Sequence, residues 1–251
     1  MTTYSIHDLE PQLAANRRYW CGWAGAQPDT DLPTYRTDIP HPLLNGVLRV
    51  RGRQLDEAIT EARKHLTGST WGWWVGADSD EGTAEGLLAR GATQIADMPV
   101  MAMDVTGMAE GQASPADLRI QVAATPAEVR EYVETYAGPL GISGDLGLVA
   151  DRELAFAYPE VVRLAGIVDG RTVGTCTLSL GTDIGALYCV ATHPDYRRRG
   201  IATALTLEAL RVARGAGRQI VTLQASSDGE PVYRQIGFDT VTRYRLYQLP
   251  E

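Results

Sequence analysis

The stretch that decides the fold runs from Val190 to Leu205 and reads VATHPDYRRRGIATAL. Residues 186–190 (ALYCV) are all apolar or aromatic, which predicts a strand that is covered on both faces. His193-Pro194-Asp195 ends this strand, because proline has no N–H to donate to a ladder. From Gly200 onward apolar residues recur at three- and four-residue spacing, which predicts a helix that begins at this glycine.

The loop between this strand and this helix is suited to a diphosphate. The first backbone N–H groups of a helix are unpaired and carry a partial positive charge, so they bind anions. Gly200 has no side chain to keep a ligand from the backbone, and Arg197, Arg198 and Arg199 add positive charge. Taken alone, the same residues also fit a plain turn with a solvated arginine cluster, so other motifs must decide.

Two further motifs follow in order. Arg197-x-x-Gly200-x-Ala202 resembles the R/Q-x-x-G-x-G/A signature of the GNAT acyltransferases, which bind the pyrophosphate of acetyl-CoA with it. Residues 223–227 (LQASS) resemble the fifth strand of that family, and residues 231–238 (PVYRQIGF) resemble its V-Y-x-x-x-G-F segment. The resemblance covers residues 117–249 and implies an α/β (α+β) fold, with a mixed twisted sheet flanked by helices.

The resemblance also implies which residues bind acetyl-CoA, the acyl-donor substrate. In the family, backbone groups of the fourth strand pair with the pantetheine arm, and amides of the next loop hold the pyrophosphate. The first role falls on Val190, Ala191 and Thr192. The second falls on Arg198, Arg199, Gly200, Ile201, Ala202 and Thr203, with Arg197 as the first motif residue, expected to stabilise the loop. Ser226 stands near a frequent cofactor-binding asparagine of the family and is expected to replace it.

The same resemblance assigns the general acid but leaves the base open. Tyr233 matches the family tyrosine near the CoA sulfur, and a phenol with a pKa of about 10 suits protonation of a thiolate with a pKa of about 8.5. An amphipathic helix would also bury a tyrosine there for packing alone. For the base, Asp183, Glu153, Tyr158 and a chain of water molecules remain as alternatives.

The N-terminal half carries all five tryptophans, at positions 20, 23, 71, 73 and 74. Apolar periodicity predicts helices at 8–19, 55–66 and 82–90 and strands at 44–50 and 71–75, with 92–105 as a hairpin broken near Pro99. This order resembles a degenerate, partial GNAT repeat. Residues 88–92 and 234–238 are loosely alike, and each segment closes a helix before terminal strands.

We therefore predict two GNAT-like units: a degenerate unit at 1–106, a linker at 107–116, and a catalytic unit at 117–251. The N-terminal half has no R-x-x-G-x-A loop, so no second phosphate site is expected. Its tryptophans either pack against the C-terminal unit or help to wall the acceptor pocket.

The C-terminal half begins with a predicted strand at 118–123 and the capping box Thr125-Pro126-Ala127-Glu128. A helix to about residue 136 follows, then a glycine-rich mobile loop at 137–147, which the resemblance places at the acceptor site. A second helix is predicted at 151–158. The later pattern predicts strands at 161–168 and 171–180, helices at 200–214 and 229–235, and strands at 220–223 and 238–249.

Composition narrows the class of protein. The formal charge of −8 over 251 residues argues against nucleic-acid binding, and no apolar run approaches the ~20 residues of a membrane span. The first residues lack the features of a signal peptide, so a cytoplasmic location is expected. The four histidines show no paired ligand spacing, so no metal is expected, and Cys21, Cys176 and Cys189 are expected to be free thiols.

The sequence thus predicts an N-acetyltransferase that moves an acetyl group from acetyl-CoA to an amine of a small molecule or peptide by direct transfer. The alternative is a non-catalytic acyl-CoA sensor on the same fold, and the protein is expected to be a monomer or a homodimer.

Overall fold

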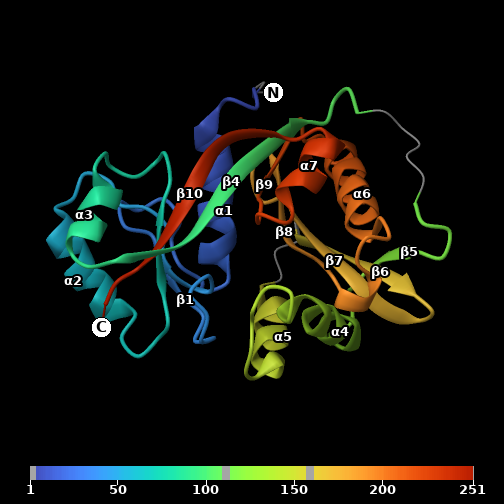
Figure 1. The fold of residues 1–251 in the computed structure, drawn as a ribbon, viewed down its shortest axis with the longest axis horizontal. Coiled ribbons are helices and arrows are strands. Elements are labelled where there is room, and N and C mark those ends of the chain that lie inside the picture. Colours follow the sequence, from blue (N-terminus) through green and yellow to red (C-terminus); the bar gives the residue numbers. More distant parts are fainter. Residues whose placement is uncertain (1–3, 109–113, 157–160, 251) are drawn as a thin grey trace.

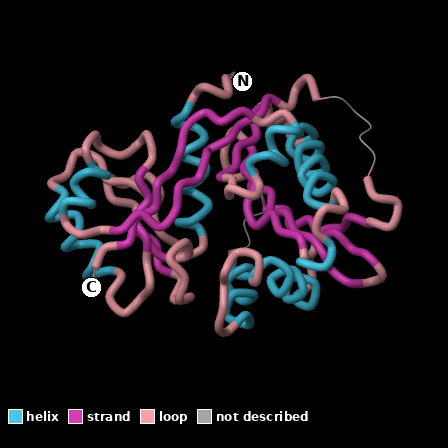
Figure 2. The backbone as a smooth tube through the Cα atoms, viewed as in Figure 1, coloured by secondary structure: helices cyan, strands magenta, loops and turns pink. Residues whose placement is uncertain are grey.

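One mixed sheet of ten strands runs through the computed structural model, which describes residues 4–108, 114–156 and 161–250. The strand order is β1-β2-β3-β10-β4-β9-β8-β7-β6-β5, and helices lie on both faces (Figure 1). The pairs β2–β3 and β8–β9 are parallel, and all others are antiparallel. The predicted fold class is confirmed. Figure 2 shows the strands running from the helices of one half to those of the other.

The N-terminal half follows most of the predicted boundaries. Its elements are α1 (Leu9–Gly22), β1 (Thr34–Arg36), β2 (Asn45–Val47), α2 (Leu55–His65), β3 (Gly72–Val75), α3 (Thr83–Ala89) and β4 (Thr93–Asp104). The predicted hairpin at 92–105 is wrong, because β4 is a single strand. Pro99 remains inside it: its carbonyl accepts a hydrogen bond from the Ala225 N–H at 2.9 Å, and the ladder to β9 begins only at Val100.

The C-terminal half supplies the remaining elements. They are β5 (Arg119–Val122), α4 (Pro126–Ala137), α5 (Leu146–Ala155), β6 (Val161–Val168), β7 (Arg171–Ser179), β8 (Gly185–Thr192), the 3-10 turn η1 (Pro194–Tyr196), α6 (Ile201–Gly215), β9 (Ile220–Gln224), α7 (Glu230–Ile236) and β10 (Asp239–Gln248). The capping box is confirmed, since the Thr125 hydroxyl accepts from the Glu128 N–H and the Glu128 carboxylate accepts from the Thr125 N–H. Helix α5 begins five residues before the predicted start at 151, because the Asp145 carboxylate accepts from the N–H groups of Gly147 and Leu148.

The two halves exchange their terminal strands. β3, α3 and β4 repeat the order of β9, α7 and β10, and both short helices end at a left-handed glycine, Gly91 (φ +81°) or Gly237 (φ +117°). However, β4 pairs with β9 of the other half, and β10 pairs with β3. Each half therefore receives its neighbouring strand from the other, as the long strands β4 and β10 show in Figure 1. The unit boundaries remain a prediction, and residues 109–113 of the linker lie outside the described residues.

Three apolar clusters fill the protein. One packs beside α2 and α3, and a second joins α6 and α7 to the sheet. The third combines α4 and α5 with the N-terminal helix α1, so α1 shares a core with the C-terminal half. The three cysteines are free, as predicted. Among the described helices, none is both long and apolar enough to cross a membrane.

Candidate active site

A gap in strand pairing opens between β8 and β9. Their parallel ladder ends at Leu187 opposite Leu223, although β8 continues to Thr192. On the other side of β8, the pairing with β7 shifts register at Cys189, whose φ is +49°. This β-bulge turns β8 away from β9. The β9-facing backbone edge of residues 190–192 has no ladder partner among the described residues, so an extended ligand chain can pair there.

The loop after β8 leads into the helix start that the sequence predicts. Gly200 is the N-cap of α6 with φ +77°, and the Ala204 N–H donates to its carbonyl at 2.9 Å. The amides of Ile201, Ala202 and Thr203 precede this first intrahelical bond and are available to an anion. Among the described residues, a Cβ atom at Gly200 would meet only Pro115, at 3.7 Å, so no described side chain blocks the approach to these amides.

The three arginines of the loop differ in role. Arg199 forms an ion pair with Asp117 and lies 5.1 Å from the centre of the Tyr196 ring. Arg197 and Arg198 are exposed and form no ion pair with any described residue. Arg199 thus anchors this loop to Asp117, and the stabilising role expected of the Arg197 side chain stays a prediction. The side chains of Arg197 and Arg198 remain available for a charged ligand.

Tyr233 lies on α7, on the other side of the sheet from α4 and α5. Its ring packs edge-on against Phe238, with 5.8 Å between the centroids, and it is buried. Burial raises the pKa of Tyr233 well above its usual value, and the thiol of Cys176, which faces the bulge from β7, raises it further. No described residue hydrogen-bonds to the hydroxyl of Tyr233, so this hydroxyl is available to donate a hydrogen bond.

The other predicted polar residues are mostly engaged. The Ser226 hydroxyl accepts from the Gly229 N–H at 3.1 Å and thereby shapes the turn before α7, while its own O–H can still donate. Asp183 accepts from the Tyr4 hydroxyl at 2.9 Å. Glu153 is fully buried, with an ion pair to Arg163 at 2.8 Å and a hydrogen bond from Tyr136 at 3.0 Å. Tyr158 lies outside the described residues, and the base remains unassigned.

Aromatic side chains of α1 pack against β8 at Tyr188 and Cys189. The Tyr19 ring stacks on Tyr188 with 3.5 Å between the centroids, and its hydroxyl lies 3.9 Å from the Cys189 sulfur. Trp20 lies 6.0 Å from Tyr188, and Trp23 lies 6.3 Å from Phe156. Tyr19 carries no functional signal in the sequence beyond its place at the end of a predicted helix. Trp71 and Trp73 instead belong to the apolar core of the N-terminal half.

The N-terminal half contains a counterpart of the phosphate loop that is closed by the protein itself. The parallel pair β2–β3 matches β8–β9, and Gly52, with φ +65°, lies two residues before Gln54, the N-cap of α2, whereas Gly200 is itself the N-cap of α6. The carboxylate of Asp80 accepts from the Gly52 N–H at 2.6 Å, and the Asp80 N–H donates to Val50 at 2.9 Å. An internal carboxylate thus occupies the Gly52 amide of this loop.

The same half also lacks the phenol. The Phe238 N–H donates to the carbonyl of Tyr233 at 3.0 Å, and the Ala92 N–H donates to the carbonyl of Leu87 at 3.1 Å. Leu87 therefore stands where Tyr233 stands in the other half. The loop and the phenol occur together only once in the described chain.

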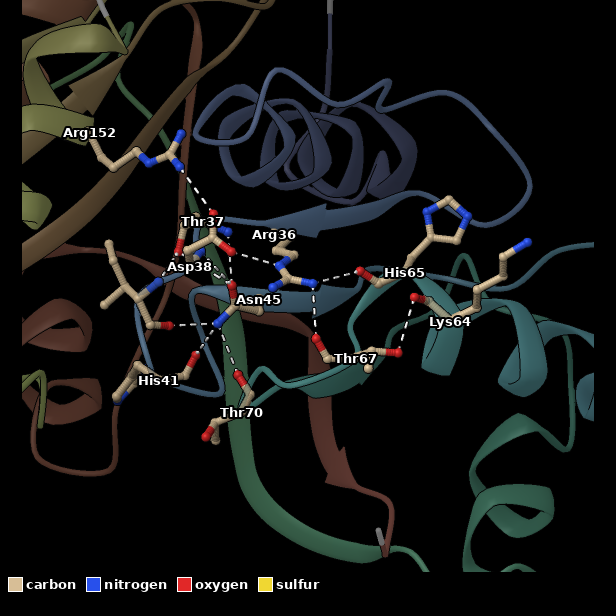
Figure 3. A network of polar contacts seen from close by, with 11 residues as sticks. Arg36, Thr37, Asp38, His41, Asn45, Lys64, His65, Thr67, Thr70 and Arg152 are labelled. Atoms are coloured by element: carbon tan, nitrogen blue, oxygen red, sulfur yellow. Dashed lines mark hydrogen bonds and ion pairs between the residues drawn. The ribbon is translucent and has the colours of Figure 1, made fainter.

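A polar network fixes the loop between β1 and β2 and reaches α5 (Figure 3). Asn45 is fully buried; it accepts from the Thr37 N–H at 2.8 Å and donates to the Thr70 carbonyl at 2.9 Å. Asp38 binds Arg36 at 2.7 Å and Arg152 of α5 at 3.4 Å. The N-terminal half is thereby tied to α5, which packs against α4.

Comparisons with known proteins agree with this geometry. The model of the acetyltransferase (GNAT) family matches residues 131–238. A mycothiol acetyltransferase of Saccharomonospora viridis is 41% identical over 64 residues, a match that spans 24% of this chain and only 21% of that relative. A GCN5-related N-acetyltransferase from Kribbella flavida superposes with a TM-score of 0.69 at 15% identity, covering 100% of this chain and 97% of the other. A tandem GNAT protein from the clavulanic acid biosynthesis pathway gives 0.61 at 18% identity, covering 86% and 77%.

Proposed function

Residues 131–238 form a domain of the GNAT acetyltransferase family, and on that premise we propose that the protein is an N-acetyltransferase. It transfers an acetyl group from acetyl-CoA directly to an amine of a small molecule or peptide. The partial match to a mycothiol acetyltransferase supports the acetyl group and a small-molecule acceptor.

The observation that carries this proposal is the opening of β8 from β9 next to the helix start at Gly200. The pantetheine arm would pair with the free edge of residues 190–192 as an added strand. The diphosphate would lie against the amides of Ile201, Ala202 and Thr203, with Arg197 and Arg198 at the rim. The thioester would then reach the bulge, between α7 on one side and α1, α4 and α5 on the other.

The reaction needs one new bond and two proton movements. The unprotonated amine attacks the thioester carbonyl, a C–N bond forms and the C–S bond breaks. Tyr233 donates its phenolic proton to the departing thiolate. The proton of the attacking nitrogen passes to a base that stays unassigned, with Asp183, Glu153, Tyr158 and a chain of water molecules as the alternatives; the described carboxylates Glu153 and Asp183 are both hydrogen-bonded to other groups.

Titration calorimetry with acetyl-CoA, followed by a thiol-release assay with a panel of amines, tests the proposal. We expect micromolar binding of one equivalent per chain, because Asp80 closes the counterpart loop, and weaker binding of dephospho-CoA. Thiol release that depends on an amine would support the enzyme. Binding without release for every amine would favour an acyl-CoA sensor, and no binding of any acyl-CoA would refute both functions.

A further inference from the structure

One buried hydroxyl holds the bulge in β8. Thr175 of β7 has no exposed surface, and its Oγ1 donates to the Cys189 carbonyl at 2.6 Å. The ladder pairs Thr175 with Ala191, and the next pair joins Thr177 to Tyr188, so Cys189 and Val190 both face the single residue Cys176. The hydroxyl therefore binds the bulged strand at the residue where the register shifts.

The bulge needs such a contact. A residue with a Cβ atom is unfavourable at the left-handed φ of +49° that Cys189 adopts, and glycine or asparagine is the usual choice there. The register shift also takes the Cys189 carbonyl out of the regular ladder, and a buried carbonyl without a donor is costly. Threonine is stiff about χ1, so the hydroxyl of Thr175 stays directed at this carbonyl.

Other contacts to the bulge are weaker or involve the side chain alone. The Tyr19 hydroxyl meets the Cys189 sulfur at 3.9 Å and does not touch the backbone. Thr177, on the same strand, shares its hydroxyl with Tyr132 at 2.8 Å. Within the described chain, Thr175 is the side chain that hydrogen-bonds to the backbone of Cys189.

We propose that Thr175 is a positioning residue for acetyl transfer: its hydrogen bond fixes the Cys189 bulge and so keeps β8 open to the coenzyme beyond Leu187. The proposal rests on the proposed function, because the open edge matters only if acetyl-CoA binds there. Thr175 itself is buried behind β8 and acts through the strand rather than by touching the substrate.

Three variants test this role. Thr175→Val removes the hydroxyl at nearly constant shape, and Thr175→Ser keeps it. Thr83→Val is the matched control, because Thr83 on α3 of the N-terminal half is also buried and its hydroxyl likewise donates to a backbone carbonyl, that of Asp80, at 2.6 Å. Each variant is measured for acetyl-CoA affinity by calorimetry, for KM and kcat in the thiol-release assay, and for its crystal structure without coenzyme.

We expect Thr175→Val to weaken acetyl-CoA affinity about tenfold, as the loss of one buried hydrogen bond implies, and to lose the left-handed conformation at Cys189. Thr175→Ser should restore most of the affinity. Thr83→Val should lose stability but bind acetyl-CoA like the wild type. This pattern would separate positioning from a general effect on the fold.

Two results would overturn the inference: an unchanged affinity in Thr175→Val, or an equal loss in Thr83→Val. If the wild-type protein binds no acyl-CoA, the proposed function fails separately. The crystal structure of Thr175→Val then still decides the inference, because a bulge retained at Cys189 without the hydroxyl would refute the structural step on which it depends.

Discussion

Replacing Gly200 by asparagine and by aspartate tests whether the helix start of α6 holds the diphosphate. The two side chains have nearly the same shape and differ by one charge. Both tolerate a left-handed backbone better than most residues, and the Cβ atom meets only Pro115 at 3.7 Å. Each variant should therefore fold, at a cost of about 1 kcal/mol for the backbone at φ +77°.

The charge supplies the difference between the two variants. A carboxylate about 4 Å from a phosphate charge in a water-like medium is repelled by about 1 kcal/mol, so the two charges of a diphosphate contribute about 2 kcal/mol. This corresponds to an affinity that is roughly 30-fold weaker for aspartate than for asparagine at low salt. At an ionic strength of about 1 M the Debye length falls to about 3 Å, and most of the difference should vanish.

Calorimetry with acetyl-CoA at two salt concentrations measures both effects. The same pair of substitutions at Gly52 is the control, because Gly52 has φ +65° and open space around its Cβ position. Its amide is bound to Asp80, so these variants should bind acetyl-CoA normally. Equal affinities of the two Gly200 variants at low salt would refute the diphosphate site, and a matching loss at Gly52 would point to a second one.

Two further predictions concern tyrosines. Tyr233→Phe should lower kcat roughly hundredfold, the lower end of what a general acid contributes, while the calorimetric affinity for acetyl-CoA stays within about twofold; an equal fall in both would exclude the acid role. Burial raises the pKa of seven described tyrosines, namely Tyr19, Tyr35, Tyr132, Tyr136, Tyr188, Tyr233 and Tyr244. Above about pH 10 the unfolded chain loses these protons while the folded protein keeps them, so the free energy of unfolding should fall by up to about 1.4 kcal/mol per tyrosine per pH unit. Urea unfolding between pH 7 and 11 measures this, and a constant stability across that range would contradict it.

The central part of the fold could be predicted from sequence because its determinants are local. Apolar residues before His193 and the glycine at 200 mark a strand, a loop and a helix within one short stretch, and the structure places them as predicted. The capping box at Thr125 is equally local. In each case neighbouring residues alone decide the backbone conformation.

The bulge and the closed counterpart loop have no comparable signal. A left-handed residue is usually expected at glycine, yet the bulge falls on Cys189, where a hydroxyl from another strand stabilises it. The Gly52 loop is closed by Asp80, which is 28 residues away in the chain. Both features depend on side chains that only the folded protein brings together.

The exchange of terminal strands could not be predicted from the sequence either, because the alternating residues at 93–104 fit a hairpin as well as one long strand.

This exchange gives the N-terminal half a role, although that half lacks the open loop and the phenol. β9 forms one side of the gap in pairing between β8 and β9. β9 pairs with β8 over only three residues, whereas it pairs with β4 over five. β4 therefore holds β9 in place, and with it α7 and Tyr233. At the same time Tyr19 of α1 packs against the bulge, with its ring on Tyr188 and its hydroxyl next to the Cys189 sulfur. A fragment that begins at residue 117 would lose β4, which pairs with β9 beside the gap, and α1, which packs against the bulge. We therefore propose that the N-terminal half is a structural part of the proposed acetyl-CoA site.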